Sequence, residues 1–276
     1  MLFKLHQRIQ IYQNFGFMRS GKLYQFDQPT SYQPLWHWQQ QLVQQRIQDP
    51  NLADLVILTE HLPVYTFGRG ADLTYAKFDL ADPKIEWHRV ERGGEVTFHA
   101  PGQIVGYPIL NLNFYQRDLH WYLRQLEEVL ILTLAEFGIV GERRDRLTGV
   151  WVNERKIAQI GIKCSRWITM HGFALNVNLD LGGFERIVPC GISDRTCCKM
   201  SEFVPGLEVT PVRSVVAHKF TEVFNLELRL SLPSAIYRDR PGVVATALAY
   251  SSDRPFHPLD SDRDLHSWHW QSLPQS

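Results

Sequence analysis

Cys190 stands between two residues that favour a tight turn, Pro189 and Gly191. Such a turn leaves the sulfur accessible, unlike a cysteine within an apolar strand. A thiol has a pKa of about 8.5, and a neighbouring ammonium group lowers that value and increases the share of nucleophilic thiolate. A single cysteine is more commonly a buried, inert residue, so a chemical role for Cys190 depends on a partner.

Lys156 is the candidate partner. Residues 149–161 predict a β-hairpin with its turn at Asn153 and Glu154, and Lys156 begins the returning strand. A lysine in this position is usually a solvated residue of an edge strand. If it lay opposite Cys190, however, the pair would be competent to accept an acyl group.

Residues 92–103 predict the wall of a pocket. Gly93 and Gly94 permit positive φ and close approach of the backbone, while Arg92, Thr97 and His99 add hydrogen-bond donors. A Gly-Gly hairpin turn is the plainer interpretation. The concentration of donors favours a pocket that could hold a carboxyl or carbonyl group.

The sequence predicts no metal site and no cofactor. Six residues separate Cys190 from the pair Cys197 and Cys198, and no His-x3–5-His pattern lies nearby, so the spacing is not that of common zinc sites. We interpret Cys164, Cys197 and Cys198 as packing residues or incidental thiols. Neither a G-x-x-x-x-G-K-[ST] phosphate loop nor a strand-linked G-x-G-x-x-G is present.

The elements that must position these residues form strands in clusters with helices between them, which favours an α+β fold with antiparallel pairing. Ser31 is predicted to cap a helix that carries Leu35, Trp38 and Leu42, and Thr210 opens another. The clearest helix spans residues 118–137, with Gly138 at its C-terminal cap. Strands are predicted at residues 54–58, 87–91, 95–99, 104–109, 150–153, 157–163 and 167–178.

Composition indicates a soluble, globular protein. The 276 residues include 29 Lys and Arg against 29 Asp and Glu, so there is no chain-wide basic field for nucleic acid and no polybasic run for a lipid surface. The longest apolar run, at residues 129–140, is too short to span a bilayer. Because the N-terminus lacks a secretory pattern and only four cysteines are present, we expect a cytoplasmic setting.

Five ordered segments resemble the lipoate-protein ligase B family, the octanoyltransferases of lipoate biosynthesis. They keep the family's order and approximate spacing between residues 32 and 224, and they depart from its pattern at Ala100, where glycine is usual. The segments are residues 60–69 (Glu-His-Leu-Pro-Val-Tyr-Thr-Phe-Gly-Arg), 92–108, 156–161 (Lys-Ile-Ala-Gln-Ile-Gly), 171–176 (His-Gly-Phe-Ala-Leu-Asn) and 189–191 (Pro-Cys-Gly).

The resemblance implies a fold like that of the biotin and lipoate ligases, with a mixed, mostly antiparallel sheet flanked by helices. It implies a catalytic acyltransferase domain at residues 29–230, between an N-terminal extension (1–28) and a polar Pro-, Ser- and Asp-rich tail (231–276).

The resemblance also implies the reaction. Octanoyl, or lipoyl, would pass from acyl carrier protein to Cys190, and then to a lysine on the lipoyl domains of 2-oxoacid dehydrogenases or on glycine cleavage H protein. Lys156 would favour the thiolate and then act as acid or base. By carry-over from the family, the acyl channel is lined by Arg92, Gly93, Gly94, Glu95, Val96, Thr97, Phe98, His99, Gln159, Ile160, Gly161, Gly172, Phe173 and Ala174.

Three alternatives remain open. The enzyme could use His99 or His171 as the base for Cys190, it could be an ATP-dependent lipoate or biotin ligase of the same fold, or it could be a scaffold that binds lipoyl domains without turnover. For an acidic carrier protein, residues 143–146 (Arg-Arg-Asp-Arg) are the candidate basic patch, or else a solvated loop. We expect a monomer.

Overall fold

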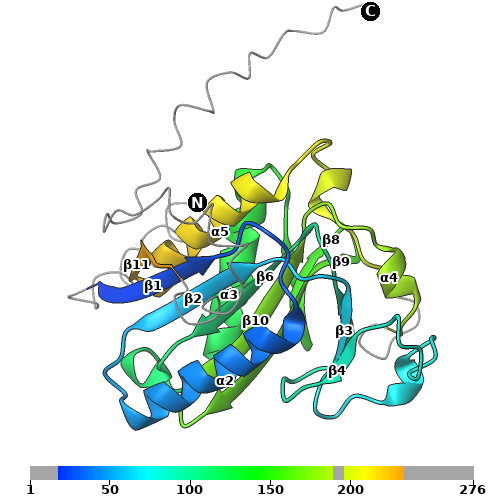
Figure 1. Ribbon diagram of the computed structural model, residues 1–276. Coiled ribbons are helices and arrows are strands. Elements are labelled where there is room, and N and C mark those ends of the chain that lie inside the picture. The colour runs from blue at the N-terminus through cyan, green and yellow to red at the C-terminus, as the bar shows by residue number, and fades with distance from the viewer. Residues whose placement is uncertain (1–17, 189–195, 233–276) are drawn as a thin grey trace, which may run out of the picture.

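The computed structural model describes residues 18–188 and 196–232, and its largest element is an eight-stranded mixed sheet (Figure 1). The strand order is β11-β1-β2-β6-β10-β9-β8-β7; β11, β1 and β2 run parallel, and the other neighbours pair antiparallel. The strands are β1 (Arg19–Gln25), β2 (Asp54–Thr59), β6 (Gln103–Ile109), β7 (Glu142–Arg144), β8 (Leu147–Val152), β9 (Arg155–Ser165), β10 (Ile168–Asn176) and β11 (Leu226–Leu230).

Helices cover both faces of this sheet. Helix α2 (Tyr32–Gln48) packs on one face, and α3 (Leu119–Glu136) and α5 (Val209–Phe224) pack on the other (Figure 1). Successive side chains of a strand point to opposite faces, so in β2 Ile57 packs with α2 while Val56 packs with α3 and α5. With both faces covered, every residue of β2 is buried, as the continuous apolar run predicts.

A second, smaller sheet lies beside the first and has the order β4-β3-β5. Its strands are β3 (Val64–Phe67), β4 (Trp87–Arg89) and β5 (Val96–His99). An aromatic cluster joins this sheet to the short helix α4 (Gly182–Glu185). The centroid of the Phe98 ring lies 4.9 Å from that of Tyr65 and 5.8 Å from that of Phe184. The remaining short helices are η1 (Leu73–Tyr75), η2 (Leu112–Phe114) and η4 (Met200–Glu202).

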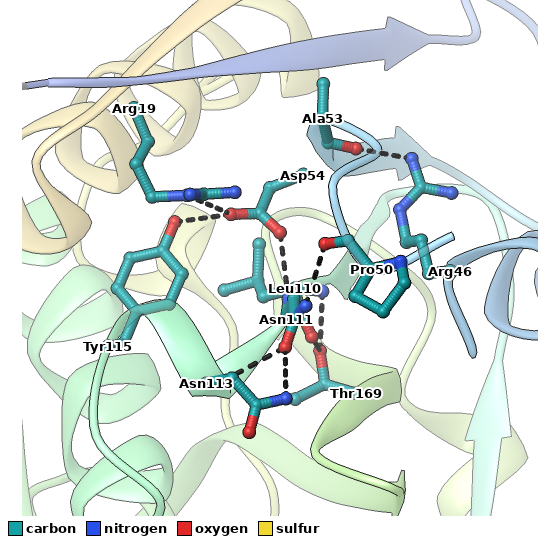
Figure 2. Close-up of polar contacts among 10 residues, drawn as sticks. All are labelled: Arg19, Arg46, Pro50, Ala53, Asp54, Leu110, Asn111, Asn113, Tyr115 and Thr169. Atoms are coloured by element: carbon teal, nitrogen blue, oxygen red, sulfur yellow. Dashed lines mark hydrogen bonds and ion pairs between the residues drawn. The ribbon is translucent and has the colours of Figure 1, made fainter. Parts of the chain in front are cut away.

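A buried carboxylate joins β1, β2 and the segment that follows β6 (Figure 2). Asp54 accepts hydrogen bonds from the Asn111 backbone N–H at 2.8 Å, the Tyr115 hydroxyl at 2.8 Å and Arg19 Nε at 3.2 Å. These donors compensate for the cost of burying the charge. Nearby, the Thr169 hydroxyl donates to the Pro108 carbonyl at 2.7 Å. The cluster stabilises the sheet, and none of these residues lines the cavity described below.

The structure corrects several local predictions. Ser31 is the N-cap residue of α2, as predicted, but its side chain makes no capping hydrogen bond. Asp118 is the residue that caps α3, because its carboxylate accepts from the backbone N–H groups of His120 and Trp121. The strand predicted at residues 87–91 ends at Arg89. Four strands, β1, β3, β7 and β11, were not predicted.

No helix among residues 18–188 and 196–232 combines the length and the apolarity needed to cross a membrane.

Candidate active site

A cavity lies between the large sheet and the small sheet. Its walls come from β5, β6, β9 and β10, and Tyr32 at the start of α2 and Phe184 of α4 also contribute. Most of the lining surface is apolar, with Val105, Ile160 and Phe173 among the contributing residues. The cavity therefore offers a hydrophobic chain a site whose polar groups are few and fixed in position.

Of the residues that the sequence assigned to the acyl channel, all line this cavity except Gly93 and Phe98. Gly93 donates its backbone N–H to the Ile162 carbonyl at 2.9 Å and so joins the loop to β9. Phe98 packs in the aromatic cluster of the small sheet. Its neighbours Thr97 and His99 line the cavity, and the Thr97 hydroxyl is buried with no hydrogen-bond partner among residues 18–188 and 196–232.

Arg92 organises the loop that carries these residues. It is 8% exposed and donates to the Thr66 carbonyl at 2.5 Å, to the Thr66 hydroxyl at 2.9 Å and to the Gly93 carbonyl at 3.0 Å. The loop lies close against β9, where a Cβ at Gly161 would come within 2.9 Å of the Gly93 carbonyl oxygen. Only glycine fits at Gly161 without displacing the wall.

Lys156 also lines the cavity, near the start of β9. Its backbone pairs with the segment that resumes at Thr196: Lys156 N–H donates to the Thr196 carbonyl at 3.1 Å, and Cys198 N–H donates to the Lys156 carbonyl at 3.0 Å. Cys190 lies outside the described residues. Phe184, which precedes that gap, and Cys197, which follows it, both line the cavity.

The remaining cysteines differ in their surroundings. Cys198 is fully buried, and burial raises the pKa of its thiol to about 12. Burial also raises the pKa of Cys164. Cys197 is half-buried on the cavity wall, where Gln159 Nε2 lies 3.8 Å from its sulfur. No pattern in the sequence predicted that Cys197 lines this cavity.

Two buried imidazoles lie beside the cavity and are held neutral. His61 Nε2 contacts the Tyr107 hydroxyl at 2.7 Å, and His99 Nδ1 contacts Gln103 Oε1 at 2.7 Å. Burial lowers the pKa of His61 to about 4 and that of His99 to about 3, where the charge of His61 also contributes. An imidazole with such a low pKa is a weak general base at neutral pH.

His171 is also buried, and burial lowers its pKa although the Glu91 carboxylate lies 3.5 Å from its Nε2. His99 and His171 are therefore both poorly suited to the role that the Cys/His alternative gives them.

The predicted basic patch at residues 143–146 is largely neutralised. Arg143 pairs with Glu127 at 3.1 Å and with Glu128 at 2.6 Å, and Arg144 pairs with Glu154. The loop therefore presents little uncompensated positive charge. Within the described part of the chain, no group of three His, Cys, Asp or Glu side chains is placed to hold a metal ion.

Comparison with known proteins agrees with these observations. Residues 31–221 match the family model of the lipoyl protein ligase A/B catalytic domain. The octanoyltransferase of Nostoc punctiforme is 58% identical over 201 residues, which are 73% of this chain and 87% of that protein. The octanoyltransferase of Gloeobacter violaceus is 53% identical over 212 residues, 76% of this chain and 94% of that protein.

Among solved structures, lipoate-protein ligase A bound with ATP superposes with a TM-score of 0.66 at 15% identity, covering 79% of this chain and 90% of that chain. A bi-partite lipoate protein ligase from Thermoplasma acidophilum gives a TM-score of 0.65 at 16% identity, covering 79% and 89%. These similarities confirm the predicted α+β fold of the lipoate ligases. Together with the sequence matches, they establish that the chain belongs to the lipoyl protein ligase A/B family and, within it, to the lipoate-protein ligase B family, as its motifs predict.

Proposed function

We propose that this protein is an acyltransferase that moves an octanoyl group onto lipoyl domains, in the first step of protein lipoylation. The observation that carries the proposal is a cavity with Lys156 on its wall, in a chain 58% identical to an octanoyltransferase over most of that relative's length. The relative supplies the reaction, and the cavity supplies a site where an acyl chain could bind.

In the proposed mechanism, the Cys190 thiolate attacks the carbonyl carbon of an octanoyl thioester, and the carrier protein leaves as a thiolate that takes a proton from the Lys156 ammonium. The amine of an acceptor lysine then attacks the new thioester, an amide forms, and Cys190 leaves as the thiolate. As an ammonium ion, Lys156 favours the Cys190 thiolate; after it has protonated the carrier thiolate, its neutral amine accepts the proton that the attacking amine loses, which restores the starting thiolate and ammonium pair. Thioester exchange is nearly balanced in free energy and amide formation is downhill, so the reaction needs neither ATP nor a cofactor.

The acyl chain is proposed to bind along the cavity, against residues 92–99, 159–161 and 172–174. Apolar residues such as Ile160 and Phe173 contribute its wall. Each buried CH2 group could contribute up to roughly 0.8 kcal/mol, so a chain of eight carbons gains enough binding free energy for the cavity to select its length.

The proposed donor is octanoyl-acyl carrier protein. The proposed acceptors are the lipoyl domains of 2-oxoacid dehydrogenases and glycine cleavage H protein, and the proposed setting is the cytoplasm, where the protein would act as a monomer. One similar solved structure is described as a lipoate protein ligase with its E2 lipoyl domain, which supports an acceptor of this class.

Octanoyl transfer without ATP is the expected result when the protein is incubated with octanoyl-acyl carrier protein and an unmodified lipoyl domain. Intact mass spectrometry should show one octanoyl group on the lipoyl domain, at equal rates with and without ATP. Modification only from octanoic acid plus ATP would instead identify a ligase, and binding without modification would identify a scaffold.

A further inference from the structure

Lys156 reaches the cavity because the pairing of β8 with β9 shifts by one residue. Val150 pairs with Ala158, but Trp151 pairs with Lys156, so Ile157 is skipped in the register. Residues directly opposite one another in an antiparallel pair project to the same face. Lys156 therefore shares a face with Trp151, whereas Ala158 shares the other face with Val150.

This shift reverses the direction of the lysine side chain. In a regular strand Lys156 and Ala158, which are two residues apart, would point to the same face. Ala158 and Val150 pack into the core beneath α3 and α5, so an unshifted Lys156 would be buried there. The extra residue turns Lys156 toward Gln159 and the cavity, in keeping with the frequent occurrence of β-bulges next to active sites.

Two residues of β8 then form a seat for the lysine side chain. The Lys156 ammonium nitrogen lies 5.0 Å from the centroid of the Trp151 ring, within the range of a cation–π interaction. At Gly149, a Cβ atom would lie 2.6 Å from Lys156 Cε and 3.3 Å from Nζ. The space that Gly149 leaves open is therefore the space that the end of the lysine occupies, and Trp151, which is 1% exposed, forms a rigid surface beside it.

We propose that Gly149 and Trp151 are positioning residues that hold the Lys156 ammonium at the cavity wall. This inference rests on the proposed function, in which Lys156 stabilises the Cys190 thiolate. The ring face attracts the cation but not the neutral amine, so the seat acts on the lysine in the protonation state that the thiolate needs. The other ionisable groups that line the cavity are left in place when only the tryptophan ring is changed; they are Tyr32, Arg92, Glu95, His99, Tyr107, His171 and Cys197.

Trp151→Phe tests the seat, because phenylalanine keeps the packing but presents a weaker ring face. The measurement is the alkylation rate of Cys190 by iodoacetamide from pH 5 to pH 10, read on the Cys190 peptide by mass spectrometry. We expect the midpoint to rise by about half a pH unit, equivalent to about threefold less thiolate at neutral pH. We also expect kcat for octanoyl transfer to fall while KM for octanoyl-acyl carrier protein stays unchanged. The midpoint and kcat of Trp151→Tyr should lie between those of Trp151→Phe and those of the unsubstituted protein.

The same substitution in a Lys156→Ala background provides the decisive comparison. If Trp151 acts through the lysine, Trp151→Phe moves neither the alkylation midpoint nor the rate once the lysine is absent. Trp38→Phe, at a buried tryptophan of α2, is the matched control and should leave the midpoint unchanged. Gly149→Ala should lower kcat at least tenfold. Gly149→Ala also places a Cβ 2.6 Å from the Ala158 carbonyl oxygen at a backbone φ of +133°. If the Gly149→Ala variant does not fold, the Trp151 variants alone provide the test.

The outcomes separate the seat from the function on which it rests. An unchanged midpoint in Trp151→Phe, or an equal shift with and without Lys156, would overturn the positioning role and leave the acyltransferase intact. Full transfer activity in Lys156→Ala would overturn the role of the lysine itself.

Discussion

Lys156→Ala and Lys156→Met variants should acquire an octanoyl group about 10²- to 10⁴-fold more slowly than the unmodified protein. A positioned acid–base group contributes a factor of this size, and without the ammonium the Cys190 thiol loses the charge that is proposed to favour its ionisation. Methionine keeps much of the aliphatic stem, so a loss shared by both variants reports on the amine. The rate is measured in a single turnover with octanoyl-acyl carrier protein, by quenching in acid and recording intact mass.

Lys163→Ala is the matched control for this experiment. Lys163 lies on the same strand, β9, and its ammonium pairs with Glu91 at 3.7 Å, but it does not line the cavity. We expect its acyl capture to be within twofold of the unmodified protein. If Lys156→Ala captured octanoyl at the normal rate and His99→Ala or His171→Ala did not, the Cys/Lys mechanism would be replaced by the Cys/His alternative.

Acidification should destabilise the fold by about 3–4 kcal/mol between pH 7 and pH 5, mainly through His61 and His99. An unfolded histidine has a pKa of about 6.5, whereas burial lowers that of His61 to about 4 and that of His99 to about 3 in the folded protein. Below pH 6.5 the unfolded state therefore binds more protons than the folded state, so stability falls as the pH falls. The loss is about 1.4 kcal/mol per pH unit for each group and continues until the folded-state pKa is reached.

Urea unfolding at pH 7 and pH 5 measures this effect, and two histidine variants locate it. His61→Gln removes one of these two imidazoles, so the part of the stability difference between the two pH values that His61 and His99 supply should shrink by about half. His37→Gln, at an exposed position on α2, should leave that difference unchanged. Equal stability at both pH values in the unsubstituted protein would show that folding does not lower the pKa values of His61 and His99.

The elements specified by local signals were predictable from the sequence. The hairpin of β8 and β9 turns at Asn153 and Glu154, as expected, with φ of +47° and +70° at these two residues; two-residue hairpin turns require such left-handed conformations. The apolar residues of α3 recur at helical spacing within the segment itself, so this helix could also be predicted from local sequence. Gly138 follows the helix with a φ of +72°. The motif at residues 156–161 placed Lys156 and Gly161 on one cavity wall.

What the sequence did not predict depends on distant contacts. Strand β1 is identified by its parallel pairing with β11, some 200 residues further along the chain, and no local period marks it. The register shift at Ile157, which turns Lys156 toward the cavity, is set by the partner strand. Tyr32 and Cys197 reach the cavity only because α2 and the segment after residue 195 are brought to it by the fold.

Phe98 is a different case, because a simple rule could have found it. Family motifs gave residues 92–99 as one continuous wall, yet side chains in β5 alternate between two environments. Thr97 and His99 line the cavity, whereas Phe98 packs with Tyr65 and Phe184. The two-residue period separates Phe98 from Thr97 and His99, although Val96, which lies on the same side of β5 as Phe98, also lines the cavity.

The most direct measurement is to locate the acyl group after incubation with octanoyl-acyl carrier protein in the absence of an acceptor. The protein is quenched in acid and digested, and its peptides are examined by mass spectrometry. We predict one octanoyl thioester, on Cys190, that disappears in Cys190→Ala and persists in Cys197→Ala, although Cys197 lines the cavity. An octanoyl group on another residue, or continued transfer to lipoyl domains by Cys190→Ala, would contradict the mechanism.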